Sequence, residues 1–205
     1  MIPEIDMLRS HLHRSAVKHS LLLVIPLALT LSASSSLQRK AVPTCICGVV
    51  QPLEKARKFD EALKQIKPFI GDGKYDQGVV LNAYAWEMAH TQDLNEALNT
   101  ANIAIAKCSA EGKKEALDTR AYILLHKSRP AEALNDINES LKAQPESPTY
   151  LIRRAMCYEQ LGQIEQAKED LHRARKNSFD WHMELDHATA NDAEIQHLEK
   201  LALET

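Results

Sequence analysis

Apolar residues recur at intervals of three and four along this chain of 205 residues, from about Lys55 onward, and strict alternation of apolar and polar residues is scarce. That interval places apolar side chains along one side of a helix, whereas a half-buried strand needs a period of two. Short breaks divide the pattern, among them the polar stretch 111–114, Pro130 and Gly162. The pattern therefore predicts an all-α protein made of several separate helices.

Two series of alanines repeat along the helical region in the same register. The first series consists of Ala85, Ala121 and Ala155, and the second of Ala97, Ala133 and Ala167. Within each series the steps are 36 and 34 residues, and the two extra residues fall at the polar stretch 111–114. Helix backbones can approach closely only where side chains are small, so each unit is predicted to be a pair of antiparallel helices. Pro130 suits the first turn of a second helix, where its missing N–H costs nothing.

A unit of about 34 residues with paired helices resembles the tetratricopeptide repeat. The second unit matches the family pattern at Leu117, Ala121, Leu124, Ala133, Ile137, Ser140 and Pro145. The first unit matches through Leu81, Tyr84, Ala85, Met88, Ala97, Ala101 and Ala104, and the third through Leu151, Ala155, Tyr158, Ala167, Leu171 and Ala174. Arg120 and Arg154 stand where the family usually has leucine. The resemblance covers 59–176 and implies an α-solenoid of antiparallel helix pairs with about three full repeats.

Before the full repeats, the chain offers only part of a unit. The stretch 59–70 repeats the second-helix pattern, with Ala62 in register with the second alanine series. Gly48 and Pro52 make the segment before it a poor helix. We therefore expect a partial N-terminal repeat, preceded by a linker or partial helix at 41–58.

Beyond the repeat domain 59–178, residues 179–205 are expected to form a C-terminal capping helix. Its predicted apolar face consists of Ile195, Leu198, Leu201 and Ala202. Asn191 or Asp192 is a suitable N-cap. An open stack of helix pairs needs such an ending, because its last apolar face would otherwise meet water.

Residues 1–40 have a different composition. A basic leader precedes the uncharged apolar run Leu21–Ala33, and small residues follow it at 32–36. A membrane-spanning helix needs about 20 apolar residues, so a run of 13 is more typical of a secretory signal. We expect a signal peptide or a membrane anchor, and hence a periplasmic, secreted or membrane-anchored protein, and leave cleavage open.

Charge and motifs exclude several function classes. The net charge of −3 offers no basic field for nucleic acid. The chain has no glycine-rich phosphate loop, no Gly-x-Ser-x-Gly and no His-Glu-x-x-His motif, so we expect no catalytic site and no cofactor. Cys45 and Cys47, the enzymatic alternative as a redox or metal pair, lack a partner pair. On a helix His182 and His187 are five residues apart and diverge, and Asp186 neighbours only His182, so we interpret these residues as solvated polar residues rather than metal ligands.

The resemblance implies that the first helix of each unit lines a groove that binds a protein or peptide partner. Carried over position by position, the candidate groove residues are Asn82, Trp86, Asp118, Tyr122, Ile152 and Met156. Aromatic anchors supply much of the energy in peptide recognition. Core positions for Trp86 and Tyr122 are an equal alternative, because the two registers differ by one residue.

The leading functional hypothesis is a non-catalytic adaptor, exported or membrane-tethered, that holds a protein or peptide in this groove. The alternative is a structural subunit of a cell-envelope assembly that makes contact through its convex face or its C-terminal helix. A clamp for a chaperone's C-terminal carboxylate is not expected, since only Asn82 and Arg153 approximate the lysine and asparagine set of such clamps.

Overall fold

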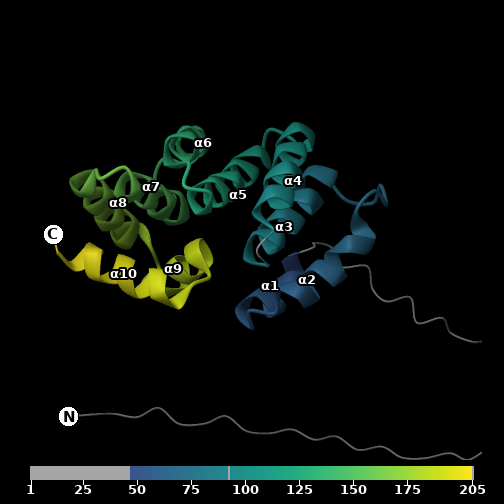
Figure 1. Ribbon diagram of the computed structural model, residues 1–205, viewed down its shortest axis with the longest axis horizontal. Coiled ribbons are helices and arrows are strands. Elements are labelled where there is room, and N and C mark those ends of the chain that lie inside the picture. The colour runs from purple at the N-terminus through teal and green to yellow at the C-terminus, as the bar shows by residue number, and fades with distance from the viewer. Residues whose placement is uncertain (1–46, 92, 205) are drawn as a thin grey trace, which may run out of the picture. The chain divides into compact units, whose positions relative to one another are not determined.

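The computed structural model describes residues 47–91 and 93–204 (Figure 1). All regular secondary structure in these residues is helical, as the periodicity predicted. The bounds are α1 Cys47–Lys55, α2 Phe59–Ile66, a short 3-10 helix η1 Lys67–Phe69, α3 Gln77–His90, α4 Leu94–Lys107, α5 Lys113–His126, α6 Pro130–Ala143, α7 Pro148–Gln160, α8 Ile164–Asn177, α9 Trp181–Thr189 and α10 Asp192–Leu203. None of the described helices is long and apolar enough to cross a membrane.

Helices α1 to α8 form four successive pairs, α1–α2, α3–α4, α5–α6 and α7–α8. Each first helix packs on its own partner and on the second helix of the preceding pair. All six alanines of the two repeated series are completely buried where these helices meet. The packing confirms the predicted α-solenoid and its physical reason, which is close approach at small residues.

The turns inside the pairs α1–α2, α5–α6 and α7–α8 share one geometry. Arg57, Ser128 and Gly162 all adopt the left-handed backbone conformation, with φ of 52°, 54° and 72°. In each turn the next amide N–H donates back to a carbonyl five residues earlier, as in Lys58 N to Leu53 O at 2.8 Å. This is a C-terminal helix cap of the Schellman type. Arg57 therefore stands at the turn position of a repeat, and α1 and α2, of nine and eight residues, form a shortened pair before the three full ones.

The segment before Phe59 forms a helix of only nine residues, in agreement with the partial helix expected at 41–58. Helix α1 forms despite Pro52, which removes one hydrogen bond inside it. Val50 occupies the place that alanine holds in the later pairs, and it packs with Ala62, Ile66 and Val80 in one buried cluster. Burial of this apolar cluster outweighs the local cost of the proline, an effect that periodicity in a nine-residue segment could not reveal.

The arginines that replace the family's leucine form a repeated ion pair inside the second and third full pairs. Arg120 donates to both carboxylate oxygens of Asp136 at 2.7 Å. Arg154 does the same to Asp170 at 2.6 and 2.7 Å. Bidentate pairs of this kind are both strong and geometrically specific. The departure from leucine is therefore a second way to lock the two helices of a pair together.

Glycine is required at one close approach between α3 and α4. A Cβ added to Gly78 would lie 2.4 Å from the backbone N and Cα of Cys108. Asp76 caps the same end of α3 by accepting from the amide N–H groups of Gly78 and Val79 at 2.8 and 3.2 Å. The start of α3 is thus fixed against the end of α4.

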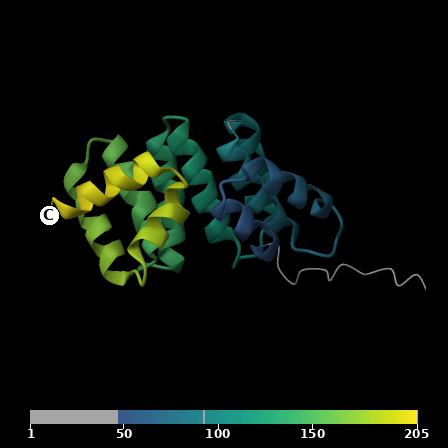
Figure 2. The same ribbon diagram turned by 90° about the horizontal axis from the view of Figure 1, so that it is seen from below.

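The C-terminal region contains two helices, not the single one expected. Asp180 caps α9, and Asn191 caps α10 by accepting from Ala193 and Glu194, as predicted. The four apolar residues predicted on α10 are buried. Helix α10 packs on α8, whereas α9 packs on α7 (Figure 2). We call α9 and α10 together the C-terminal hairpin.

Candidate partner-binding face

Helices α3, α5 and α7 turn one side toward the C-terminal hairpin. We call the side chains gathered there the first-helix face; they are Trp86, His90, Tyr122, His126 and Arg153. The face includes two of the six predicted groove residues, and Asp118 and Met156 contact its Arg153. It therefore lies where the groove was expected.

Most of the predicted groove residues are covered. Tyr122, Ile152 and Met156 are only 3%, 0% and 7% exposed, and Asp118 is buried too. Trp86 and Asn82 are partly buried. Ile152 belongs to the main apolar core rather than to a surface. The burial of Tyr122 agrees with the alternative that it is a core residue. A role in partner binding stays a prediction for all six residues.

Aromatic and histidine rings form a continuous column along the face. Phe59 stacks on His90 with ring centroids 4.4 Å apart, and His90 stacks on Tyr122 at 5.1 Å. Trp86 lies 4.8 Å from Tyr122, and His126 lies 4.1 Å from the same ring. The column joins α2, α3 and α5, so it spans three successive helix pairs of the solenoid.

The two histidines of the column are fixed in the same way. The Nδ1–H of His90 donates to the Trp86 carbonyl at 2.8 Å, and that of His126 donates to the Tyr122 carbonyl at 2.9 Å. Burial lowers the pKa of His90 to about 4, against the opposite effect of its backbone hydrogen bond. His90 is therefore neutral at physiological pH and acts as a flat, uncharged ring.

Arg153 is the charged centre of the face. Its guanidinium is completely buried, and Nε donates to Asp118 of α5 at 3.0 Å. It also lies over the rings of Tyr122 and Trp86, 4.7 and 5.8 Å from their centroids. Cation–π contacts of this kind strengthen when water is excluded. One arginine thus links α7 to both preceding first helices.

The end of α9 is held by this centre. The Tyr122 hydroxyl donates to the Thr189 carbonyl at 3.2 Å, and Nη1 of Arg153 donates to the Ala188 carbonyl. These are among the last carbonyls of a helix, which have no partner within it. Ala190 then turns the chain with φ of 48°. The face therefore binds a helix C-terminus through groups that any polypeptide carries.

Side chains of the hairpin add charged contacts around this centre. Arg57 of the α1–α2 turn donates to Asp186 at 3.0 Å and to Asp192 at 2.6 Å. Nε2 of His126 lies 3.4 Å from Glu194. The His187 ring stacks near Trp86 with centroids 6.4 Å apart. Asp186 and His187 therefore contact this region, whereas His182 contacts Glu199 within the hairpin, and no group of three possible metal ligands occurs among the described residues.

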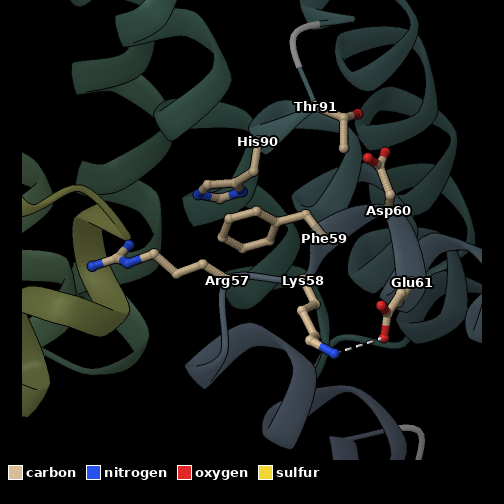
Figure 3. Close-up of a pocket in the computed structure, with 7 residues that line it drawn as sticks. All are labelled: Arg57, Lys58, Phe59, Asp60, Glu61, His90 and Thr91. Carbon is tan, nitrogen blue, oxygen red and sulfur yellow. Dashed lines mark hydrogen bonds and ion pairs between the residues drawn. The ribbon is translucent and has the colours of Figure 1, made fainter.

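A hollow of about 410 Å³ borders the face beside α2 (Figure 3). Phe59 and His90 stack in its wall, while the Arg57 guanidinium points away toward the hairpin (Figure 3). Lys58 pairs with Glu61 at 3.4 Å on the exposed side. Two basic and two acidic residues line the hollow, so its charge does not favour a particular class of ligand. The hollow therefore only extends the surface of the face.

A buried carboxyl lies on α3, one residue along from Trp86. Glu87 is completely buried, and neither of its carboxylate oxygens has a hydrogen-bond partner among the described residues. Burial, together with the nearby carboxylate of Glu54, raises the pKa of Glu87 from 4.5 to about 9. The group is therefore protonated at neutral pH, and it makes the contact between α1 and α3 sensitive to alkali.

Sequence reasoning missed three residues of this region. His90 and His126 lie 36 positions apart, and each follows an aromatic residue by four, so the repeat itself carried that signal. Arg57 had no such signal, because its partners Asp186 and Asp192 lie more than 120 positions away. Cys45 lies outside the described residues, as does the run Leu21–Ala33, and the Cys47 side chain is not described.

Comparisons with known proteins agree with this fold. No protein-family model and no curated protein sequence matches the chain. Among solved structures, MamA 41-end from Desulfovibrio magneticus RS-1 has a TM-score of 0.52 at 15% identity, covering 78% of this chain and 90% of that one. The MamA RS-1 ArsTM double mutant has a TM-score of 0.51 at 16% identity, covering 76% and 93%.

A tetratricopeptide repeat protein from Parabacteroides merdae has a TM-score of 0.50 at 19% identity, covering 78% of this chain and 65% of that one. The class of protein is thus a solenoid of helix pairs. Within that class, the chain has the tetratricopeptide-like fold that its repeats predicted. Solenoids of this kind generally present extended surfaces on which other proteins bind.

Proposed function

We propose that this protein is a non-catalytic adaptor that binds a protein or peptide partner on its first-helix face. The observation that carries the proposal is that the face already holds a polypeptide segment. Tyr122 and Arg153 donate to two consecutive backbone carbonyls, and Trp86 receives a ring of the same segment. A surface that binds main-chain groups beside an aromatic platform suits a peptide ligand.

The test must separate binding from stability, because Tyr122 and Trp86 are part of the packing. Alanine at Tyr122 would leave a cavity and destabilise the fold by about 3–5 kcal/mol. Tyr122→Phe keeps the ring and removes only the hydroxyl donor. We expect this variant to retain its helical circular dichroism and to capture less of any partner that the wild type retains from an extracytoplasmic extract.

A matched control is Tyr158→Phe, a partly buried tyrosine that packs on the main core and lies outside the first-helix face. It should leave partner capture unchanged. Equal capture by the wild type, Tyr122→Phe and Tyr158→Phe would count against the face as the binding surface.

Exposed apolar residues in the linker before α9 and on α9 itself favour a second candidate, a structural subunit that makes contact through its C-terminal helices. Phe179 is 103% exposed and Met183, four residues later, is 53% exposed. In this case Phe179→Ser with Met183→Ser should release the partner while Tyr122→Phe is silent. The two pairs of outcomes distinguish the face from the hairpin.

Export or membrane tethering through Leu21–Ala33 completes the proposal. The support is compositional, an uncharged apolar run of 13 residues behind a basic leader. Fractionation of cells, followed by sequencing of the mature N-terminus, checks it. Cleavage after the apolar run would indicate a signal peptide, an intact N-terminus in the membrane fraction an anchor, and an intact soluble chain would refute both.

A further inference from the structure

Building on the proposed function, we infer that the first-helix face is a receptor for an acidic amphipathic helix, and that the C-terminal hairpin is an internal copy of that ligand. The partner's helix would end over Tyr122 and Arg153, as α9 does, and carry carboxylates toward Arg57 and His126.

Charge complementarity defines the ligand class. Residues 180–204 contain seven carboxylates, against a single lysine. The surface that receives this segment offers Arg57 and His126 to three of those carboxylates, at distances of 2.6–3.4 Å. A basic or neutral helix would leave Arg57 without its two acceptors, so the face favours an acidic one.

The backbone groups that the face binds are not unique to the hairpin. Arg153 and Tyr122 bind backbone carbonyls at a helix end, and every helix has such unpaired carbonyls. The buried side of the hairpin is apolar, with Leu185, Ile195 and Leu198 in the main core. A ligand therefore needs an apolar side, acidic flanks and a small residue where Ala188 meets Arg153.

The hairpin is attached in a way that permits exchange. Its main packing is on α7 and α8, and it does not continue the regular pairing of the solenoid. Only residues 178–180 join it to α8, and Phe179 in that linker makes no packing contact, being fully exposed. Its ion pairs with Arg57, beside the face, are partly solvated, since the side chains of Asp186 and Asp192 are 44% and 80% exposed. A competing helix can therefore replace these contacts one at a time.

The experiment uses the full chain and a labelled synthetic peptide that reproduces residues 180–204. Fluorescence anisotropy measures binding of the peptide to the wild type and to a chain carrying Asp186→Asn and Asp192→Asn. These changes weaken only the internal ligand and leave Arg57 intact. We expect the variant to bind the wild-type peptide about 3- to 10-fold more tightly, the range for two partly exposed ion pairs.

Two matched controls accompany this measurement. Glu199→Gln removes a hairpin carboxylate that faces His182 within the hairpin, 3.2 Å away, and should leave peptide affinity unchanged. A peptide with asparagine at the positions of Asp186 and Asp192 should bind the variant chain more weakly than the wild-type peptide does. Equal affinities across both chains, or across both peptides, would overturn the inference.

Sedimentation of the same samples tests whether the hairpin of a second copy of the chain occupies the face. If the chain is a dimer that dissociates when the peptide is added, a second copy fills the face, and the inference as stated is overturned. If the peptide fails to bind but Tyr122→Phe still loses its partner, the inference alone fails. If Tyr122→Phe also keeps its partner, the proposed function fails with it.

Discussion

Arg153 and Arg154 are neighbours in the sequence, yet they serve opposite sides of the same helix. Arg154 pairs with Asp170 inside the α7–α8 pair, and Arg120 repeats that pairing with Asp136 one unit earlier. Arg153 pairs with Asp118 of the preceding unit and then reaches the carbonyl of Ala188. The first arrangement recurs in the solenoid, whereas the second occurs once among the described residues.

The two arginines therefore represent two kinds of contact: those that join the two helices of a repeat, and those that bind the C-terminal hairpin to the repeats. Contacts inside a pair join residues 16 positions apart, and they recur because every unit must close in the same way. The ion pairs of Arg153 with Asp118 and of Arg57 with Asp192 instead join residues 35 and 135 positions apart. Changes inside a pair should therefore lower global stability, while changes at the face should free the hairpin first.

The largest expected effect comes from breaking a pair-internal ion pair. Arg154→Met leaves Asp170 buried with only the more distant Arg173, 3.7 Å away, as a cation. Loss of one partner of a buried pair destabilises by about 3–5 kcal/mol, and Arg173 places this variant near the lower end. Urea unfolding at equilibrium measures the change in free energy.

Two comparisons make this result decisive. Arg129→Met removes an exposed pair with Glu132 that solvent screens, so its free energy of unfolding should stay close to that of the wild type. Arg153→Met should also destabilise, but hydrogen exchange should quicken at Ala188–Ala190 before the rest of the chain. Uniform exchange in Arg153→Met and Arg154→Met would erase the proposed difference between the two arginines.

The second effect is an alkaline loss of stability through Glu87. The native carboxyl keeps its proton up to a pKa of about 9, whereas the unfolded one releases it near 4.5. The stabilisation is therefore complete below pH 4.5 and is lost as the pH rises toward 9, at about 1.4 kcal/mol per pH unit. Glu87→Gln should abolish this slope between pH 7 and 9, where His90 is neutral in both states.

Melting temperatures measured at several pH values report this dependence of stability on pH. Glu96→Gln, an exposed change on the neighbouring helix α4, should retain the slope of the wild type. A wild type whose melting temperature is constant from pH 7 to pH 9 would contradict the buried protonated carboxyl. Because Glu87 lies between α1 and α3, the effect also reports on the N-terminal pair.

The sequence predicted the repeated part of the molecule because repetition multiplies a weak signal. Ala85, Ala121 and Ala155 each indicate little alone, but in one register they locate three first helices. For α1 the sequence left a linker and a partial helix open, because Val50 replaces the alanine and Pro52 disfavours a helix locally. Its stability comes from packing on α2 and α3, which no short window of sequence contains.

The sequence indicated which residues lie together on the first helices, but it did not indicate that the C-terminal hairpin covers them. The first-helix register correctly brought Trp86 and Tyr122 together, 4.8 Å apart. The hairpin that covers them depends on contacts of Arg57 and Arg153 with residues far along the chain, and periodicity cannot encode such pairs. A single capping helix was predicted because the apolar pattern of α10 is strong and that of the short α9 is weak.

A third and smaller effect tests the close approach inside the α3–α4 pair. Gly78→Ala would force its Cβ against the backbone of Cys108, and overpacking of this kind costs about 1–3 kcal/mol. Gly112→Ala is the matched change, because its nearest neighbour would lie at an ordinary 3.5 Å. Urea unfolding should place Gly112→Ala close to the wild type, and equal losses would show that α4 shifts to make room.

The smallest effect concerns Arg57, which combines a turn position of the repeat with a contact to the hairpin. Its left-handed φ of 52° suits glycine, as at Gly162 in the equivalent turn. Arg57→Gln keeps the strain and loses both ion pairs, so it should destabilise by about 0.5–1 kcal/mol. Arg57→Gly loses the same pairs but relieves a strain of about 1 kcal/mol, so its global stability should stay near that of the wild type.

The two variants of Arg57 should nevertheless free the hairpin equally. Hydrogen exchange at α9 reports its opening, while urea unfolding reports the whole domain, and only the second measurement should separate glutamine from glycine. Ser128→Gly, at the same turn position but without a contact to the hairpin, should raise stability and leave exchange at α9 unchanged. If Arg57→Gly protected α9 as well as the wild type does, Arg57 would belong with the repeated contacts of the solenoid, and the hairpin would be held without its two ion pairs.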